Sequence, residues 1–161
     1  MVAVWSPESL EEVADRCRAF QTRPGGRIVG LVNGCFDVLH PGHVLFLREA
    51  GEHCNALVVA IDGDEQVVLA KGASRPLRPW PERAFMVAAV RGVFAVVQLD
   101  RHQPLEMVLA AIHPDLYMFR AGGPIEELQA ARRLGLGMLE LPRHGAWSTT
   151  RELARWQKRA P

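Results

Sequence analysis

Two histidines flank a glycine in the segment 40–43, which reads His-Pro-Gly-His, and this pattern suggests chemistry on a phosphate group. An apolar run at 27–33 precedes the segment and predicts a buried strand, and a mostly apolar stretch at 44–50 predicts a helix. The first turn of a helix offers free N–H groups and a partial positive charge, and the glycine lets a phosphate come close to the backbone. The imidazoles of His40 and His43, three positions apart, can point to one side and donate hydrogen bonds to charge that develops at phosphorus. A turn with incidental histidines is the competing interpretation, and two histidines around a glycine disfavour it.

Apolar runs and helix signals alternate along the whole chain. We expect strands at residues 27–33, 56–61, 93–97, 116–119 and 136–141. We expect helices from a Ser6 cap to about Phe20 and at 44–50, 64–70, 82–91, 104–112 and 124–134, with a last helix capped by Ser148. This alternation predicts an α/β fold, a Rossmann-like doubly wound five-stranded parallel sheet with helices on both faces. Ligands bind beyond the carboxyl ends of the strands in such sheets, so the residues that follow each strand are the candidates for chemistry.

The composition indicates a soluble chain with one domain. Its 161 residues suit a single domain, in which 1–26 form an N-terminal helix and loop and 27–155 form the core. The formal net charge of +1 gives no electrostatic footprint for nucleic acid. The three cysteines are scattered and form no zinc-binding pair, which fits a reducing cytosol. No apolar run reaches the length of a membrane span and no signal peptide is recognisable, so we expect a cytoplasmic protein without a membrane partner.

Three segments resemble the HxGH nucleotidylyltransferases, a family that includes glycerol-3-phosphate cytidylyltransferase and the heptose-1-phosphate adenylyltransferases. NGCFDVLHPGHVLFL, at 33–47, is similar to the family's first signature. VVAIDGDEQVVLAKG, at 58–72, is similar to its second strand, acidic turn and Lys-Gly pair. PRHGAWSTT, at 142–150, resembles its second signature, R-T-x-G-I-S-T-T, in the arginine and the Ser-Thr-Thr. The resemblance extends from about residue 27 to 155, and the chain could also be one domain of a longer bifunctional enzyme.

The resemblance implies that the phosphate or phosphonate of an acceptor attacks the alpha-phosphorus of an NTP and that pyrophosphate leaves. It implies four catalytic residues, His40, His43, Lys71 and Arg143. It implies that the nucleotide is bound by Asn33, Gly34, Cys35, Phe36, Asp37, Gly42, Arg83, Ser148, Thr149 and Thr150. Mg²⁺ is expected to arrive with the NTP rather than in a metal site built by the protein.

Several of these residues also have a purely structural interpretation. Lys71 and Arg143 could be exposed surface cations, and Arg83 could cover a helix face with its aliphatic stem. Ser148 caps a helix in either case, and a capped helix N-terminus is also an anion site. Cys35 is expected to be a small packing residue rather than a nucleophile.

Different segments of the sequence indicate different nucleotide donors and different acceptors. Segment 74–90 resembles the adenylyltransferases, which use ATP, whereas Arg143 with its Ser-Thr-Thr resembles the cytidylyltransferases, which use CTP. FRAGGP at 119–124 stands where the adenylyltransferases carry K-G-G-D-Y, which argues against a heptose phosphate. Trp147 is bulkier than the family's residue there and could narrow the base slot for a pyrimidine. We therefore expect CTP with a small phospho- or phosphono-alcohol, and ATP with a sugar phosphate such as heptose 1-phosphate is the alternative.

A non-catalytic nucleotide-binding module is the alternative from another class. The presence of both histidines and both phosphate-binding cations argues against it. A class I aminoacyl-tRNA synthetase also carries an HxGH motif, but this chain has no KMSKS-like loop and no basic charge for tRNA. The resemblance to the nucleotidylyltransferases further implies a homodimer.

Overall fold

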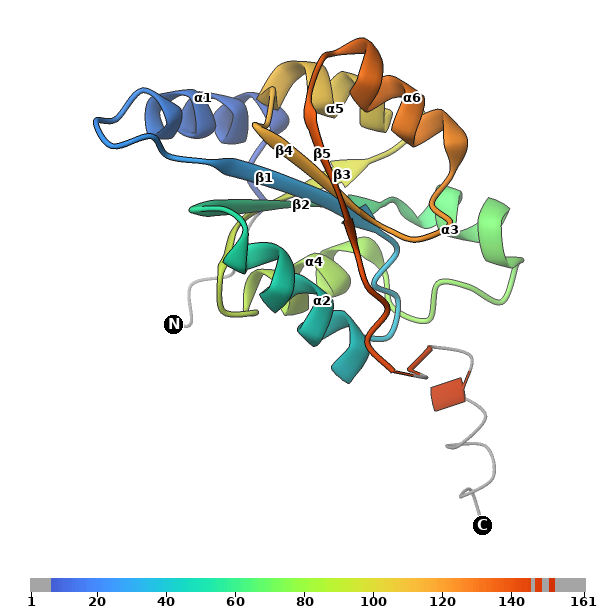
Figure 1. Ribbon diagram of the computed structural model, residues 1–161. Helices are drawn as coiled ribbons and strands as arrows, with labels where there is room; N and C mark the ends of the chain where they lie inside the picture. Colours follow the sequence, from blue (N-terminus) through green and yellow to red (C-terminus); the bar gives the residue numbers. More distant parts are fainter. Residues whose placement is uncertain (1–6, 146, 149–150, 153–161) are drawn as a thin grey trace, which may run out of the picture.

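The core of the protein is a five-stranded, all-parallel sheet (Figure 1). The computed structural model describes residues 7–145, 147–148 and 151–152. Its strands are β1 (Val29–Gly34), β2 (Ala56–Asp62), β3 (Val93–Leu99), β4 (Leu116–Arg120) and β5 (Gly137–Leu141). They lie in the order β3-β2-β1-β4-β5, so β1 is central and the chain winds outward from it in both directions. This order confirms the predicted Rossmann-like, doubly wound α/β fold.

Helices cover both faces of the sheet, as the alternating sequence predicts. They are α1 (Leu10–Gln21), α2 (Pro41–Glu52), α3 (Asp64–Lys71), α4 (Trp80–Ala88), α5 (Leu105–Ile112) and α6 (Ile125–Arg133). Helices α1, α5 and α6 pack on one face and α2 and α4 on the other (Figure 1). Strand β2 is apolar from Ala56 to Ile61 because Val58 and Ala60 face the first group while Leu57 and Val59 face the second. None of the helices in the described ranges combines the length and the apolar character that crossing a bilayer requires.

The starts of α1, α2 and α4 differ from the sequence-based prediction, and the helix expected at 44–50 is α2, which begins at Pro41. Ser9 is the N-cap of α1, where its hydroxyl accepts from the Glu12 N–H at 3.2 Å and its own N–H donates to the Glu12 carboxylate at 2.7 Å. This reciprocal capping box satisfies two N–H groups and fixes the helix start, whereas the predicted cap Ser6 lies outside the described residues. The helix expected at 82–91 is α4, which begins earlier because Pro81 suits the first turn of a helix.

Asp115 ties the amino-terminal ends of β1 and β4 together. Its carboxylate accepts from the Val29 N–H at 2.8 Å and from Gln21 Nε2 at 3.1 Å, and its own N–H donates to the Val29 carbonyl at 2.9 Å. Strand β5 passes close by, since an ideal Cβ on Gly137 would lie 2.6 Å from the Asp115 carbonyl oxygen. The amino-terminal edge of the sheet is therefore bonded to the protein's own groups, and chemistry has to be sought at the carboxyl edge.

Gly137→Ala is expected to lower the free energy of unfolding by about 1–3 kcal/mol. The new methyl group would clash with the carbonyl oxygen of Asp115, a residue that its hydrogen bond to Val29 holds in place. Gly51→Ala is the matched control. Nothing lies within 4 Å of an ideal Cβ there, and alanine favours a helix over glycine by up to about 1 kcal/mol. Urea unfolding measures both variants, and equal stability of Gly137→Ala and the wild type would contradict the close approach of β5.

Candidate active site

The two histidines of the HxGH motif lie together where β1 leads into α2. His40 is the N-cap of α2, and its Nδ1 accepts a hydrogen bond from the His43 N–H at 3.3 Å. The two imidazoles stack with 3.8 Å between ring centroids and an angle of 16° between ring planes. The ring of Phe36 lies beside His43, with 5.1 Å between centroids. The spacing of three residues therefore brings both imidazoles to one side, as the sequence predicts.

Burial keeps this histidine pair neutral near physiological pH. Burial lowers the pKa of His43 to about 3, with the charges of His40, Arg120 and Lys71 adding to the effect and the Val38 carbonyl opposing it. Burial also lowers the pKa of His40, and the Arg120 charge acts in the same direction. A neutral imidazole carries one N–H, which in His40 falls on Nε2 because Nδ1 accepts a bond. His43 Nδ1 is buried without a hydrogen-bond partner in the described part of the chain, so the pair retains unused hydrogen-bonding capacity.

Three basic side chains converge near the histidine pair from the ends of different elements. Lys71 ends α3, and its charge lowers the pKa of both histidines. Arg120 ends β4 and lies with its guanidinium carbon 4.3 Å from the ring centroid of Phe46 in α2. Arg143 follows β5, donates to the Ala121 carbonyl at 3.5 Å and, after burial, is the second cause that lowers the pKa of Arg120. Among the described residues none of these three cations has a carboxylate partner, so their charge is available to an anionic ligand.

Arg120 is the residue of this site that the sequence analysis missed. In the sequence, segment 119–124 is notable only because it lacks the lysine of K-G-G-D-Y. A signal was present, because Arg120 directly follows the strand expected at 116–119. Ligands bind at the carboxyl edge of a parallel sheet, so a basic residue at such a strand end is a candidate phosphate contact.

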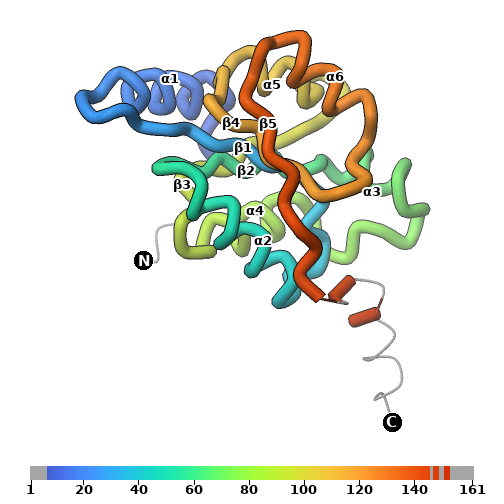
Figure 2. Tube along the Cα trace, in the orientation of Figure 1, coloured from blue at the N-terminus to red at the C-terminus, as the bar shows by residue number. Residues whose placement is uncertain are grey.

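The segment after β5 lies against α2 (Figure 2). His144 contacts the carboxylate of Glu49 and forms an ion pair with it when protonated. An ideal Cβ on Gly42 would lie 2.8 Å from Cβ of Trp147, so glycine is required beneath this tryptophan. Trp147 is 41% exposed and therefore covers the first turn of α2 rather than joining the core. These contacts hold the segment that carries Arg143 beside the histidine pair.

The Ser-Thr-Thr segment is described in part. The Ser148 hydroxyl accepts from the Arg151 N–H at 3.2 Å and its carbonyl accepts from the Glu152 N–H at 3.0 Å, which confirms it as a helix cap. Thr149 and Thr150, which the resemblance assigns to nucleotide binding, lie outside the described residues. The role of this segment in binding phosphate stays a prediction.

Asp37, assigned to nucleotide binding by the resemblance, is buried and holds the loop 72–79. Its Oδ1 accepts from the N–H groups of Leu77 at 2.7 Å and Arg78 at 3.3 Å. Its other carboxylate oxygen forms an ion pair with Arg75. Both oxygens have protein partners, so the geometry favours a role in positioning the loop, and the predicted nucleotide contact is untested.

Arg83 is buried too, with 1% of its surface exposed, and it joins three segments through its guanidinium. Its Nε donates to the Arg78 carbonyl at 3.0 Å, and Nη2 pairs with the Asp64 carboxylate at 2.7 Å. Its Nη1 donates to the Cys35 carbonyl in the turn after β1. The alternative in which the aliphatic stem covers a helix face is therefore wrong, because the charged group makes the contacts. A direct nucleotide contact stays a prediction, and the bonds observed favour a positioning role.

A buried hydrogen-bond network holds Asn33 at the carboxyl end of β1. Asn33 Nδ2 donates to Glu127 at 2.9 Å, and the Tyr117 hydroxyl donates to Asn33 Oδ1 at 2.8 Å. Burial raises the pKa of Glu127 and of Tyr117. Cys35 donates to Asp62 at 2.9 Å, and burial together with that carboxylate raises the pKa of its thiol to about 12. Such a thiol stays protonated, which fits the expected packing role rather than a nucleophile.

The turn that follows β1 depends on the glycine at position 34. Phe36 has a φ of 47°, in the left-handed region, and an ideal Cβ on Gly34 would lie 3.2 Å from the Phe36 ring. Glycine at this position lets the aromatic ring fold back toward the histidine pair. Gly34 and Phe36 therefore shape the entrance to α2, and their predicted contact with nucleotide is untested.

The fold and the site define a Rossmann-like α/β protein in which an HxGH helix and three cations without a carboxylate partner among the described residues suit the chemistry of phosphates. The chain belongs to the cytidylyltransferase-like family, whose model matches residues 31–136. This family of nucleotidyltransferases is the one that the motifs resemble.

The chain is similar to bifunctional proteins of known sequence and to two solved structures. Bifunctional protein HldE of Acidiphilium cryptum is 38% identical over 152 residues, which are 91% of this chain and 30% of that protein. Bifunctional protein HldE of Gluconacetobacter diazotrophicus is 38% identical over 137 residues, covering 81% of this chain and 27% of that protein. The chain thus spans less than a third of the length of these relatives.

Among solved structures, a lipopolysaccharide core biosynthesis protein from Thermoplasma volcanium aligns with a TM-score of 0.63 and 18% identity, covering 74% of this chain and 99% of that chain. Pantoate-beta-alanine ligase from Francisella tularensis aligns with a TM-score of 0.60 and 9% identity, covering 91% of this chain and 71% of that chain. At these identities the structures support the fold alone. The homodimer and the cytoplasmic location stay predictions.

The half-buried His43, whose Nδ1 is shielded from solvent, predicts a loss of stability as the pH falls from 6.5 toward 3. Its pKa is depressed in the folded state, so the unfolded chain binds the proton first and stability present above pH 6.5 declines through this window. In urea unfolding at several pH values, His43→Gln should lose stability less steeply than the wild type over this range. His53→Gln, at the exposed end of α2, controls for the loss of an imidazole as such. Parallel slopes for His43→Gln and the wild type would contradict a buried neutral His43.

Proposed function

We propose that the chain transfers a nucleotidyl group from an NTP to the phosphate or phosphonate of a small acceptor, with release of pyrophosphate. The observation that carries this proposal is the neutral, stacked pair of His40 and His43 at the N-terminus of α2, with Lys71 and Arg120 beside it and Arg143 next to Arg120. Neutral imidazoles donate hydrogen bonds without adding charge, and the N-terminus of a helix favours an anion through its partial positive charge. This arrangement suits a phosphorus atom whose oxygens gain negative charge during attack.

The proposed reaction needs no nucleophile from the protein. An oxygen of the acceptor's phosphate forms a bond to the alpha-phosphorus while the bond from that phosphorus to the bridging oxygen breaks. The electron pair of the broken bond leaves with pyrophosphate. His40 and His43 would donate to the non-bridging and bridging oxygens, where charge increases, so the protein contributes positioning and electrostatic stabilisation.

The leaving pyrophosphate is assigned to the side of the site formed by β4 and β5. Arg120 and Arg143 lie there, and a guanidinium can bind phosphate oxygens through two parallel N–H groups. Mg²⁺ bound to the triphosphate would add to this neutralisation. Within the ranges that the structure describes, no group of three or more His, Cys, Asp or Glu side chains is arranged to hold a metal ion. In this proposal Mg²⁺ enters the site bound to the nucleotide.

For the donor we propose ATP, with CTP as the second candidate. The HldE relatives support the adenylyltransferase branch, which segment 74–90 resembles. In the sequence, Arg143 favours CTP because it resembles the cytidylyltransferase signature. In the structure it lies beside Arg120, and an arginine that contacts phosphate there would not distinguish cytosine from adenine. Trp147 lies over Gly42 at the phosphate-binding turn, so its bulk does not argue for a pyrimidine either. The likeness of PRHGAWSTT to the cytidylyltransferase signature is what keeps CTP as the second candidate.

We expect three variants to fold and to lose turnover: His40→Ala, His43→Ala and Arg120→Met. Each removes a preorganised group at the developing charge, and for the two histidines kcat should fall by about 10²–10³-fold. Pyrophosphate release is measured with ATP and CTP against sugar 1-phosphates, glycerol 3-phosphate and small phosphonates. Arg132→Met, on the exposed surface of α6, is the control and should keep full activity. Near wild-type kcat in either histidine variant would contradict the mechanism, and no release by the wild type with any pair would favour a non-catalytic module.

With equal ATP and CTP in one reaction, we expect the adenylyl product to exceed the cytidylyl product on the order of tenfold or more, since a base pocket built for one base leaves polar groups unpaired with the other. Product analysis by mass spectrometry measures the ratio. An excess of the cytidylyl product would restore the preference for CTP that Arg143 and its Ser-Thr-Thr suggest.

A further inference from the structure

Helix α2 contacts the chain segment that follows β5 at two points on one of its faces. Gly42 and Glu49 are seven residues apart, so they lie on the same face, about 10 Å apart along the helix axis. Trp147 lies over Gly42, with its Cβ 2.8 Å from an ideal Cβ on the glycine. His144 Nε2 contacts the carboxylate of Glu49. The chain after β5 therefore lies beside the helix whose N-terminus carries the histidine pair (Figure 2).

Arg143 directly precedes His144, and its own side-chain contact is weak. Its guanidinium donates to the Ala121 carbonyl at 3.5 Å, which is longer than the usual range of about 2.7–3.2 Å for such a bond. The side chain is exposed, and among the described residues it forms no ion pair with a carboxylate. The position of this arginine therefore depends on what holds the neighbouring backbone.

Repulsion from Arg120 acts against this position of Arg143. The charge of Arg143 is, after burial, the second cause that lowers the pKa of Arg120, so the two guanidinium groups are close enough to repel each other. Arg120 is held by Phe46, whose ring centroid lies 4.3 Å from the guanidinium carbon and which is on the same face of α2 as Gly42 and Glu49. Before an anion binds, the segment that carries Arg143 needs a contact that opposes the repulsion.

The contact between His144 and Glu49 can oppose it. The two side chains are 26% and 23% exposed, so a charged pair there is screened less than one on the open surface. The residues are 95 positions apart in the chain, and Glu49 is supported by a helix, so the contact joins two separate elements. In the signature R-T-x-G-I-S-T-T, which PRHGAWSTT resembles, a threonine stands at the position of His144. The pair is therefore a feature in which this chain departs from that signature.

We propose that Glu49 and His144 are positioning residues that act through Arg143. Their contact fixes the segment after β5 on α2 and thereby holds the guanidinium of Arg143 beside Arg120 before any phosphate binds. Two guanidinium groups that are already in place offer N–H donors to pyrophosphate oxygens without the cost of being ordered on binding. The proposal rests on the proposed function, in which these arginines receive the leaving pyrophosphate, and adds the residues that keep the two like charges together.

Glu49→Ala and His144→Ala test the proposal from the two sides of the contact. Each should raise the Kd of inorganic pyrophosphate, measured by calorimetry in the presence of Mg²⁺, by about tenfold, because Arg143 is no longer held in place. The KM of the nucleotide should rise by a similar factor, whereas the KM of the acceptor should stay within about twofold of the wild-type value.

Glu52→Ala, at an exposed position in the last turn of α2, is the matched control. It removes the same charge from the same helix and should leave the Kd of pyrophosphate within about twofold of wild type. Loss of a carboxylate near an anion site would by charge alone strengthen the binding of an anion. Weaker binding by Glu49→Ala is therefore the result that positioning predicts and that charge alone does not.

A double-mutant cycle with Arg143→Met determines whether the pair acts through this arginine. Arg143→Met alone should raise the Kd of pyrophosphate by about tenfold or more. When Glu49→Ala or His144→Ala is added to Arg143→Met, the Kd should change by less than about twofold, because the group that the pair positions is already absent.

Calorimetry with pyrophosphate separates this inference from the proposed function, because binding needs no turnover. The expected pattern in the cycle supports the positioning pair even if no combination of nucleotide and acceptor releases pyrophosphate, an outcome that refutes only the reaction. Unchanged affinity in both single variants, an equal loss in Glu52→Ala, a further loss of full size in the Arg143→Met background, or no binding by the wild type would each overturn the inference. If Glu49→Ala does not fold, His144→Ala, which leaves α2 unchanged, decides the question.

Discussion

Neutrality of the two stacked imidazoles is the constraint on which the rest of the site depends. Rings with centroids 3.8 Å apart repel each other if both are protonated, and burial already disfavours the charge. Arg120 and Lys71 lower the pKa of the pair further, so the cations that attract a phosphate also keep the imidazoles neutral. The site therefore combines hydrogen-bond donors with positive charge without placing that charge on the donors.

A second layer of buried charge holds this arrangement in place. Asp37 bonds the loop 72–79 to the turn after β1, and Arg83 bonds the same turn to α3 and α4. Each is almost completely buried and forms an ion pair, which is the condition under which buried charge is tolerated. Removal of one partner would leave an uncompensated charge, so these residues restrict the loops that border Lys71. Groups that a sequence motif suggests as ligand contacts serve here to preorganise their neighbours.

The local sequence predicted the helices and strands, whereas the roles of Arg83 and Arg120 depend on residues that are distant in the chain. The strand at 56–61 was recognisable because a strand covered on both faces must be apolar throughout. The helix expected at 44–50 begins three residues earlier, because the His40 side chain caps it and Pro41 suits its first turn. Arg83 was ambiguous because its partners Cys35 and Asp64 lie 48 and 19 residues away. The significance of Arg120 required knowing that β4 pairs with β1, which the order of elements along the chain does not specify.

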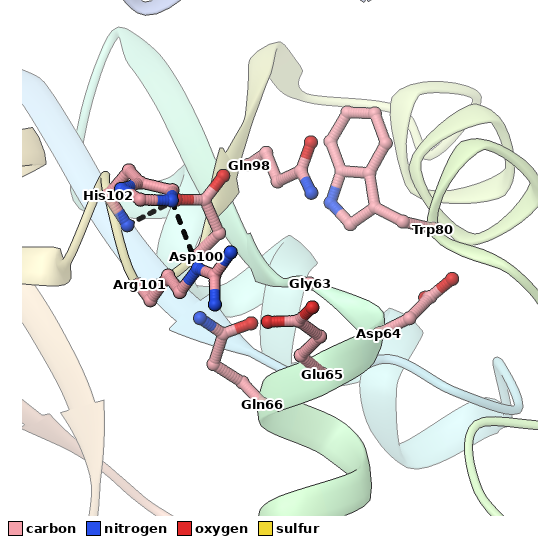
Figure 3. A pocket seen from close by; sticks show the side chains of 9 residues that line it. All are labelled: Gly63, Asp64, Glu65, Gln66, Trp80, Gln98, Asp100, Arg101 and His102. Atoms are coloured by element: carbon pink, nitrogen blue, oxygen red, sulfur yellow. Dashed lines mark hydrogen bonds between the residues drawn. The ribbon is translucent and has the colours of Figure 1, made fainter.

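The double winding of the sheet gives its carboxyl edge two halves of different chemistry. On one side of β1 the strand ends carry Arg120 and Arg143, which have no carboxylate partner among the described residues. On the other side, a cavity at the ends of β2 and β3 is lined by the amides of Gln66 and Gln98 and by three carboxylates, of which those of Asp64 and Asp100 are engaged by protein groups (Figure 3). Because the net charge is only +1, electrostatic attraction of a polyphosphate requires a local group of cations such as the one in the first half. In the proposed reaction the α-phosphorus lies at the start of the helix that follows the central strand, and pyrophosphate leaves toward Arg120 and Arg143. An in-line displacement then requires the acceptor's phosphate to approach from the opposite side, where Lys71 ends α3.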